Sequence, residues 1–181
     1  MRRNVMNLHM KSKVFSLHGK MDILDEEENI VYTVESKAIS IHNKTYLQDS
    51  QGNEIAYIYR KPISLHETHF VEMNNGVNFE LRTEWFHIVK DIINIEELGW
   101  SLRGDFFQHN YEILDENERV IASTHMKWFS IHKVYYIDIM DDSKVDTIVA
   151  LDVALERIMQ DRAAASASST GGSSGGGSSA N

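Results

Sequence analysis

The stretch Val145–Met159, VDTIVALDVALERIM, decides the fold of this 181-residue chain. Its apolar residues recur at helical spacing and occupy almost the whole circumference, and Asp152 alone interrupts them in the middle. Asp142 or Ser143 is placed to cap the N-terminus of the helix. A helix that is apolar on nearly every side requires burial on every side. Its length of about 22 Å matches the height of a barrel of tilted strands and is too short for the hydrocarbon core of a bilayer.

Ahead of this helix the chain repeats a four-residue pattern: an apolar residue, Ser, an apolar residue and His. Two weaker copies begin at Phe86 and Phe106, and the starts of successive copies lie 20 to 24 residues apart. A period near 24 residues indicates one supersecondary unit per copy. The four clear copies are Phe15–His18, Ile39–His42, Ile63–His66 and Phe129–His132.

Each unit is typical of a β-hairpin, because two runs rich in β-branched and aromatic residues flank an acidic or Asn/Gly turn. The sharpest turn is Asn75-Gly76, since both residues tolerate the positive φ of a two-residue hairpin loop. The other predicted turns are Asp25–Asn29, Asp49–Asn53 and Asp115–Glu118. Hairpins give about twelve strands in all, unless each tetrapeptide forms a short strand of its own.

A sheet of hairpins that closes on itself leaves no edge, and the interior of a wide barrel must then be filled by apolar side chains. The apolar helix can fill that interior. We therefore predict an all-β fold with one buried helix, namely a closed antiparallel barrel of about twelve strands around the hydrophobic C-terminal helix.

Composition separates a tail from this barrel and excludes several protein classes. Residues 163–181 are all Ala, Ser, Thr, Gly or Asn, which predicts a flexible low-complexity tail after a barrel domain over residues 1–162. A net charge of -9 argues against binding to nucleic acid. The absence of cysteine excludes disulfides and favours a reducing, cytoplasmic location. We expect neither a signal peptide within Met1–Lys20 nor a transmembrane segment.

Several motifs together resemble the LURP-one-related family. They are Leu98–Phe107 (LGWSLRGDFF), Tyr111–Ile113, Lys127–Ser130, Tyr136–Ile139 and the apolar helix, in this order. The resemblance covers nearly all of residues 5–161. It implies membership of the tubby C-terminal-like superfamily, and hence a twelve-stranded barrel around a central hydrophobic helix. Relatives by fold include tubby domains, which bind phosphoinositides, and phospholipid scramblases, and the resemblance implies no enzymatic activity.

The repeated histidines raise the alternative of a metal site. Within a strand, the His of each tetrapeptide faces away from the side of the two apolar residues. His18, His42, His66 and His132 are therefore expected on the outside of different strands, where they cannot converge on one ion. The sequence contains no Gly-x-Ser-x-Gly, Walker or His-Glu-x-x-His motif. We expect no metal site, no cofactor and no catalytic residue.

Four aspartates, Asp138, Asp141, Asp142 and Asp146, lead into the helix. Clustered carboxylates can hold calcium, but carboxylates at this place also cap a helix and favour its macrodipole. Their spacing lacks the Gly turn and the terminal Glu of an EF-hand loop. We favour the capping role, and the sequence leaves calcium binding by Asp138–Asp146 open.

Lysine stands two residues before the first apolar position in four of the six units. If each unit runs up the barrel and back, these lysines gather at one rim and the acidic turns gather at the other. Lysines near an anionic membrane contribute about 1 kcal/mol each. The alternative is that lysines at strand ends only keep the rim solvated. The predicted ligand-binding residues are Lys13, Lys37, Arg60, Lys61 and Lys127, with Lys11 adding to the charge.

The predicted function is a non-enzymatic barrel, cytoplasmic or peripheral at the membrane. Through the lysine-lined rim it would bind an anionic phospholipid or a phosphorylated ligand. The alternative is a protein-interaction or scaffold module with no lipid binding, which a stable protein partner would reveal.

Overall fold

The computed structural model describes residues 5–11, 20–36, 44–60, 68–82, 92–106, 108–129 and 132–169. These residues form one antiparallel sheet and one long helix, α1 (Val145–Ser169), which follows the 3-10 turn η2 (Asp142–Lys144). The strands are β1 (Met6–Lys11), β2 (Lys20–Leu24), β3 (Ile30–Ser36), β4 (Thr45–Asp49), β5 (Glu54–Arg60), β6 (Thr68–Met73), β7 (Asn78–Arg82), β8 (Ile92–Ile95), β9 (Trp100–Asp105), β10 (Asn110–Leu114), β11 (Val120–Phe129) and β12 (His132–Ile139).

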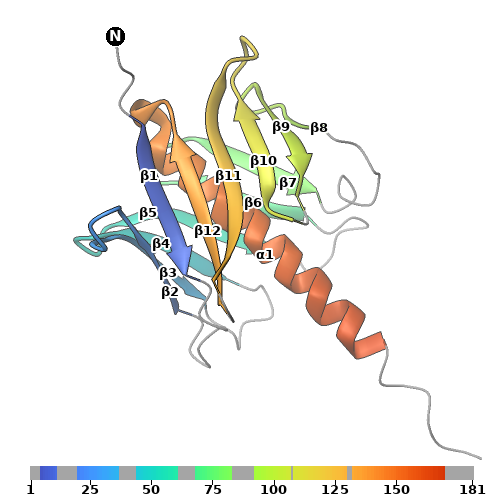
Figure 1. The fold of residues 1–181 in the computed structure, drawn as a ribbon. Helices are drawn as coiled ribbons and strands as arrows, with labels where there is room; N and C mark the ends of the chain where they lie inside the picture. The colour runs from blue at the N-terminus through green and yellow to red at the C-terminus, as the bar shows by residue number, and fades with distance from the viewer. Residues whose placement is uncertain are drawn as a thin grey trace, which may run out of the picture.

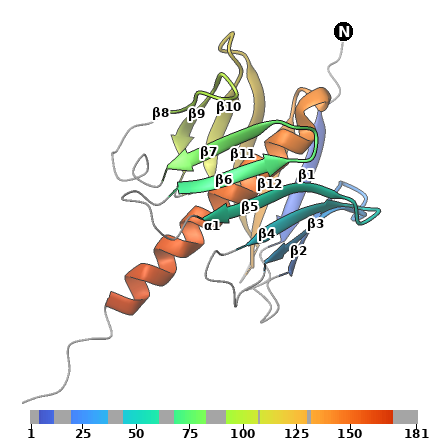
Figure 2. The same ribbon diagram turned by 180° about the vertical axis from the view of Figure 1, so that it is seen from behind.

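The twelve strands curl into a nearly closed barrel (Figure 1 and Figure 2). Their order in the sheet runs from β7 back to β1 and then from β12 back to β8. The first strand pairs with the last along its whole length, from Met6 opposite Ile139 to Lys11 opposite Val134. The two strands at the ends of the sheet, β7 and β8, approach each other. The barrel of about twelve strands that the sequence predicts is confirmed.

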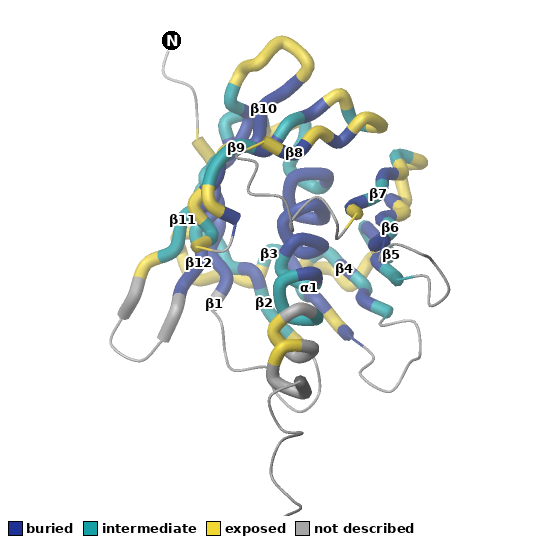
Figure 3. The backbone as a smooth tube through the Cα atoms, turned by 90° about the vertical axis from the view of Figure 1, so that its right-hand side faces the viewer, coloured by how far each residue is buried: buried dark blue, intermediate teal, exposed yellow. Residues whose placement is uncertain are grey.

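The helix α1 runs through the inside of the barrel. Figure 3 shows its buried turns enclosed by the strands. Every side chain from Ile148 to Leu155 is at most 2% exposed. The strands point alternate residues at the helix, and examples such as Ile58, Ile113 and Ile137 are at most 1% exposed. The core is thus the space between sheet and helix, and the predicted central helix is confirmed.

Both ends of the helix differ in detail from the sequence prediction. The cap is Asp141 rather than Asp142 or Ser143, because a 3-10 turn precedes α1 and Asp141 accepts a hydrogen bond from the backbone N–H of Ser143 at 3.2 Å. At its other end the helix continues past Ala163 to Ser169, into the stretch that composition assigns to the tail. Alanine is the best helix former, so an Ala/Ser stretch can extend a helix that already exists. Residues 170–181 lie outside the described residues.

Three of the predicted turns are built alike around an aspartate. The side chains of Asp25, Asp49 and Asp115 each accept a hydrogen bond from the backbone N–H four residues later, at 2.8, 2.9 and 3.0 Å. The residue before that donor has a positive φ, and the strand register shifts by one residue beside each turn. This is the pattern of a type I turn followed by a G1 bulge.

The turn at Asn75-Gly76 is not the two-residue loop that the sequence predicts. The backbone N–H of Met73 donates to the carbonyl of Val77 at 2.9 Å, so three residues form the loop, and of these Gly76 has a positive φ of 88°. The side chain of Asn75 accepts from the backbone N–H of Val77 at 3.0 Å, which favours a type I turn over the mirror-image turn.

The clear tetrapeptides that begin at Phe15, Ile39 and Ile63, and the weaker one at Phe86, lie outside the described residues. Twelve strands are present without them, so the strand count does not need the alternative in which each tetrapeptide is a strand. In the sequence these copies fall between β1 and β2, β3 and β4, β5 and β6, and β7 and β8, whereas Phe129 ends β11 and His132 begins β12.

Candidate functional site

The end of the barrel at which α1 begins carries many carboxylates, and we call it the acidic end. The antiparallel order of the strands brings the turns at 25–29, 49–53, 74–77, 96–99 and 115–119 to this end, beside η2. The carboxylates on these loops are Asp25, Glu26, Glu27, Glu28, Asp49, Glu96, Glu97, Asp115, Glu116, Glu118, Asp141 and Asp142. The clustering of acidic turns at one end agrees with the sequence prediction.

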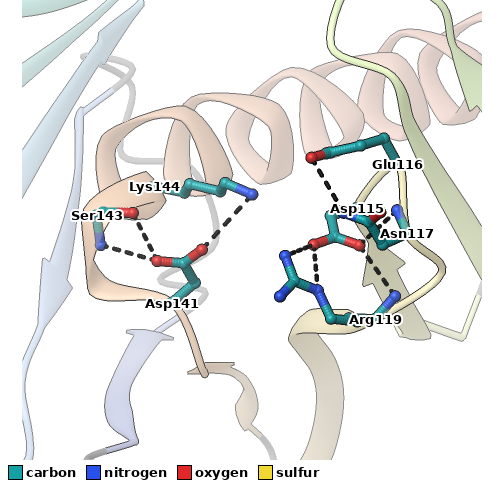
Figure 4. Close-up of polar contacts among 7 residues, drawn as sticks. All are labelled: Asp115, Glu116, Asn117, Arg119, Asp141, Ser143 and Lys144. Atoms are coloured by element: carbon teal, nitrogen blue, oxygen red, sulfur yellow. Dashed lines mark hydrogen bonds and ion pairs between the residues drawn. The ribbon is translucent and has the colours of Figure 1, made fainter.

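The two cations described on these loops are each bound by a carboxylate of the same loop (Figure 4). The guanidinium of Arg119 donates two hydrogen bonds to Asp115 Oδ2, at 2.5 and 2.8 Å. The ammonium of Lys144 lies 3.5 Å from Asp141 Oδ2. Among the described residues, these two cations therefore neutralise only a small part of the charge of the acidic end.

Asp115 and Asp141 hold the loops in place. The Arg119 guanidinium keeps the pKa of the buried Asp115 carboxyl down to about 2, and backbone N–H groups of the turn act in the same direction. The hydroxyl of Ser143 lowers the pKa of Asp141 by donating a hydrogen bond to it at 2.6 Å. These carboxylates thus stabilise the turns and the start of the helix.

The four aspartates that lead into the helix are dispersed by the fold. Asp138 faces His125 on the outer face of the sheet at 3.4 Å, and Asp146 accepts a hydrogen bond from the hydroxyl of Tyr32 at 2.6 Å. In the part of the chain that the structure describes, no three His, Cys, Asp or Glu side chains form a group able to hold a metal ion. The geometry therefore supports capping and packing roles for these aspartates.

At the opposite end, where α1 leaves the barrel, cations occupy several strand ends, and we call this the basic end. Those whose side chains are described are Lys20, Lys44, Arg60, Arg82 and Lys127. Lys20 lies 4.0 Å from Glu35, and Arg82 lies 2.6 Å from Glu80.

Of the predicted ligand-binding residues, Lys13, Lys37 and Lys61 lie outside the described residues, whereas Arg60 and Lys127 are described. Arg60 lies opposite the buried His69 on the inner face of β5, and its Nε is buried. Lys127 projects from the outer face of β11, with Nζ 4.7 Å from the ring centre of Tyr136. The fold brings both residues to one end of the barrel, but it does not bring them to one face.

A buried carboxylate, Asp152, lies at the centre of the barrel. It is 2% exposed and accepts hydrogen bonds from the hydroxyl of Tyr111 and, at 3.0 Å, from that of Thr124. Burial raises its pKa to about 6. A lone carboxylate in an apolar helix indicates that it has partners, because an unpaired buried charge is too costly. The sequence could not name those partners, since they lie 41 and 28 residues away.

Two histidines, His69 of β6 and His109 of the weaker copy of the repeat that begins at Phe106, pair with carboxylates on the last buried turns of α1. His69 Nε2 lies 3.3 Å from Asp161, and His109 Nε2 lies 3.6 Å from Glu156. The signal for His69 was present in the sequence, because it alternates with the inward residues Val71 and Met73. Both pairs connect the sheet to α1 near the point where the helix leaves the barrel.

Within the described residues, no helix combines the length and the apolar character that crossing a bilayer requires.

Comparison with known proteins agrees with this architecture. The X-ray structure of a protein from Arabidopsis thaliana superposes with a TM-score of 0.51 at 12% sequence identity, covering 85% of this chain and 93% of that one. At this level of identity the likeness shows a shared fold alone. Among curated proteins, no sequence matches this chain. The sequence model of the LURP-one-related proteins matches residues 6–156, which hold all twelve strands and most of the buried helix. This chain therefore belongs to the LURP-one-related family.

Proposed function

We propose that this barrel is a non-enzymatic, cytoplasmic module that docks on an anionic phospholipid surface through its basic end. The observation that carries the proposal is the separation of charge along the barrel axis. Carboxylates are concentrated on the turns of the acidic end, and the cations described there, Arg119 and Lys144, are each paired with one of them. Cations are concentrated at strand ends around the exit of the helix.

The separation of charge favours one orientation at a membrane. The chain carries a net charge of -9, so an anionic surface repels the molecule as a whole and attracts only its basic end. Lys127 is exposed there, and Lys37 and Lys61 follow directly in sequence after the last residues of β3 and β5. The family resemblance implies that tubby domains, which bind phosphoinositides, are relatives by fold, and this supports a phosphate-bearing headgroup as the ligand.

Liposome co-sedimentation tests the proposal. We expect the wild type to pellet with vesicles that contain about 30 mol% phosphatidylserine, not with pure phosphatidylcholine, and to be released at high salt. Changing Lys13, Lys37, Lys61 and Lys127 to Gln is expected to lower the partition coefficient at least tenfold, because each lysine near the surface contributes about 1 kcal/mol. Competition by inositol hexakisphosphate distinguishes a soluble phosphate ligand from a membrane surface.

A control variant of equal net charge separates location from total charge. Four exposed residues at the acidic end, Ser50, Gln51, Asn74 and Asn117, are changed to Glu. Because these positions lie away from the proposed surface, binding is expected to stay within about twofold of the wild type. Equal loss in both variants, or no binding of the wild type at low salt, would contradict the proposal.

A further inference from the structure

The outer face of β4, β5 and β6 carries a strip of four aromatic rings. The ring centres of Tyr46 and Tyr57 lie 5.2 Å apart, those of Tyr57 and Tyr59 lie 5.1 Å apart, and those of Tyr59 and Phe70 lie 5.4 Å apart. All four side chains are half-buried although they point away from the core. Partly exposed aromatic side chains that form a continuous strip are typical of interaction surfaces.

The strand register arranges these rings in two rows that cross the strands. In the first row Tyr46 lies opposite Tyr57, which lies opposite Glu72 on β6. In the second row Tyr59 lies opposite Phe70, which lies opposite Glu80 on β7. Both rows therefore lead from aromatic rings to a carboxylate.

Two clefts follow this face, and Glu72 lines both of them. One cleft is lined by Tyr46 and Tyr57 together with Glu54 and Lys44, and the other is lined by Phe70 together with Glu80 and Glu97. The ammonium of Lys44 lies 5.8 Å from the ring centre of Tyr57, so a cation of the chain itself already lies against this face. Glu54 and Glu97 are exposed, and no ion pair joins either of them to a cation among the described residues.

We propose that this face, which we call the aromatic wall, binds an extended, arginine-rich segment of a partner protein. The aromatic wall consists of Tyr46, Tyr57, Tyr59 and Phe70 with Glu54, Glu72, Glu80 and Glu97. Planar guanidinium groups stack on aromatic rings and form paired hydrogen bonds with carboxylates, and the two rows present both groups in succession. Arg82 already binds Glu80, and Glu72 accepts a hydrogen bond from the hydroxyl of Tyr59 at 2.9 Å, so Glu54 and Glu97 are the main carboxylates for the partner. The aromatic wall meets the basic end at Lys44 and Arg82, but its carboxylates repel anionic lipid, so this inference does not depend on the function proposed above.

Titration of the full chain with a hexa-arginine peptide, followed by amide chemical shifts, tests this inference. The largest shifts are expected on β4 to β7. The double variant Tyr57→Leu and Tyr59→Leu, which keeps every charge, is expected to weaken binding at least about fivefold. The double variant Glu54→Gln and Glu97→Gln is expected to weaken it at least about threefold. Hexa-lysine is expected to bind more weakly than hexa-arginine because its ammonium groups cannot stack.

The matched control is Glu26→Gln with Glu27→Gln, which removes two exposed charges from the acidic end. Its affinity for hexa-arginine is expected to stay within about twofold of the wild type. If the tyrosine variant fails to fold, the Glu54 and Glu97 variant tests the proposal instead. Both residues are exposed, and no ion pair joins them to a cation among the described residues, so their replacement is not expected to unfold the barrel. Shifts centred on the turns 25–29 and 115–119, equal weakening by the control, or no binding would overturn the proposal.

Discussion

Asp152→Asn is expected to stabilise the barrel at pH 7 and above by roughly 2 to 3 kcal/mol. The carboxyl of Asp152 is buried at the centre of the barrel, and burial raises its pKa to about 6. In the unfolded chain the pKa is about 3.9. Asparagine can still accept hydrogen bonds from Tyr111 and Thr124, and it carries no charge that burial would penalise.

The pH dependence follows from the same shift. Between about pH 4 and pH 6 the folded state binds a proton at Asp152 that the unfolded state lacks, so the free energy of unfolding falls as pH rises through this window. The contribution of the protonated carboxyl is therefore fully present below pH 4 and lost above pH 6. The variant is expected to match the wild type near pH 4 and to exceed it near pH 8.

Urea denaturation of both proteins from pH 4 to pH 8 measures this difference. Subtracting one curve from the other removes the titration of histidines that both proteins share. The exposed Asp142→Asn is the control, and its difference from the wild type is expected to stay small and nearly independent of pH. A variant at Asp152 that is less stable than the wild type at pH 8 would show that the buried charge itself favours the fold.

Gly104→Ala is expected to destabilise the barrel by about 3 kcal/mol or more. Gly104 lies in β9 with a φ of 132°, a backbone conformation that residues with a side chain rarely adopt. A Cβ there would collide with the carbonyl oxygen of Asn110 and would lie 2.8 Å from Tyr111 Cα. Because these atoms belong to the backbone of the paired strand β10, the clash can be relieved only by moving the strands apart.

Gly52→Ala is the matched control for this prediction. Gly52 also has a positive φ, of 85°, but a Cβ would meet no atom within 4 Å. Gly52→Ala thus introduces the backbone strain without the collision. It is expected to lower the free energy of unfolding by about 1 kcal/mol. Urea midpoints of the two variants measure the difference, and an equal loss in both would show that β9 and β10 do not approach as closely as described.

The sequence predicted the architecture well because its strongest signals are local. The apolar circumference of Val145–Met159 requires enclosure, and hairpin runs separated by acidic turns supply the strands. Gly104 belongs to a motif that carries the family resemblance, and the structure gives its physical reason, which is the close approach of β10. The details that failed, the loop at Asn75 and the cap at Asp141, depend on hydrogen bonds that compete within one turn.

The sequence predicted less well which face of the sheet each site residue occupies and which residues it contacts on neighbouring strands. Arg60 was predicted at the lysine-lined rim, and its alternation with Ala56 and Ile58 places it on the inner face of β5 at that end. The donors to Asp152 and the rows of the aromatic wall depend on pairing between strands. That pairing is set by the register of the whole sheet, which no single stretch of sequence encodes.

The central claim is that α1 is threaded through the barrel, and thiol labelling tests it most directly. The chain contains no cysteine, so Val153→Cys and Ser143→Cys each introduce one thiol, the first at a side chain that is 1% exposed and the second at an exposed position of η2. In the folded protein the thiol at position 153 is expected to react at least about a thousandfold more slowly than that at position 143, because reaction requires the barrel to open. Comparable rates at both positions, in variants that remain folded, would contradict a helix enclosed by the strands.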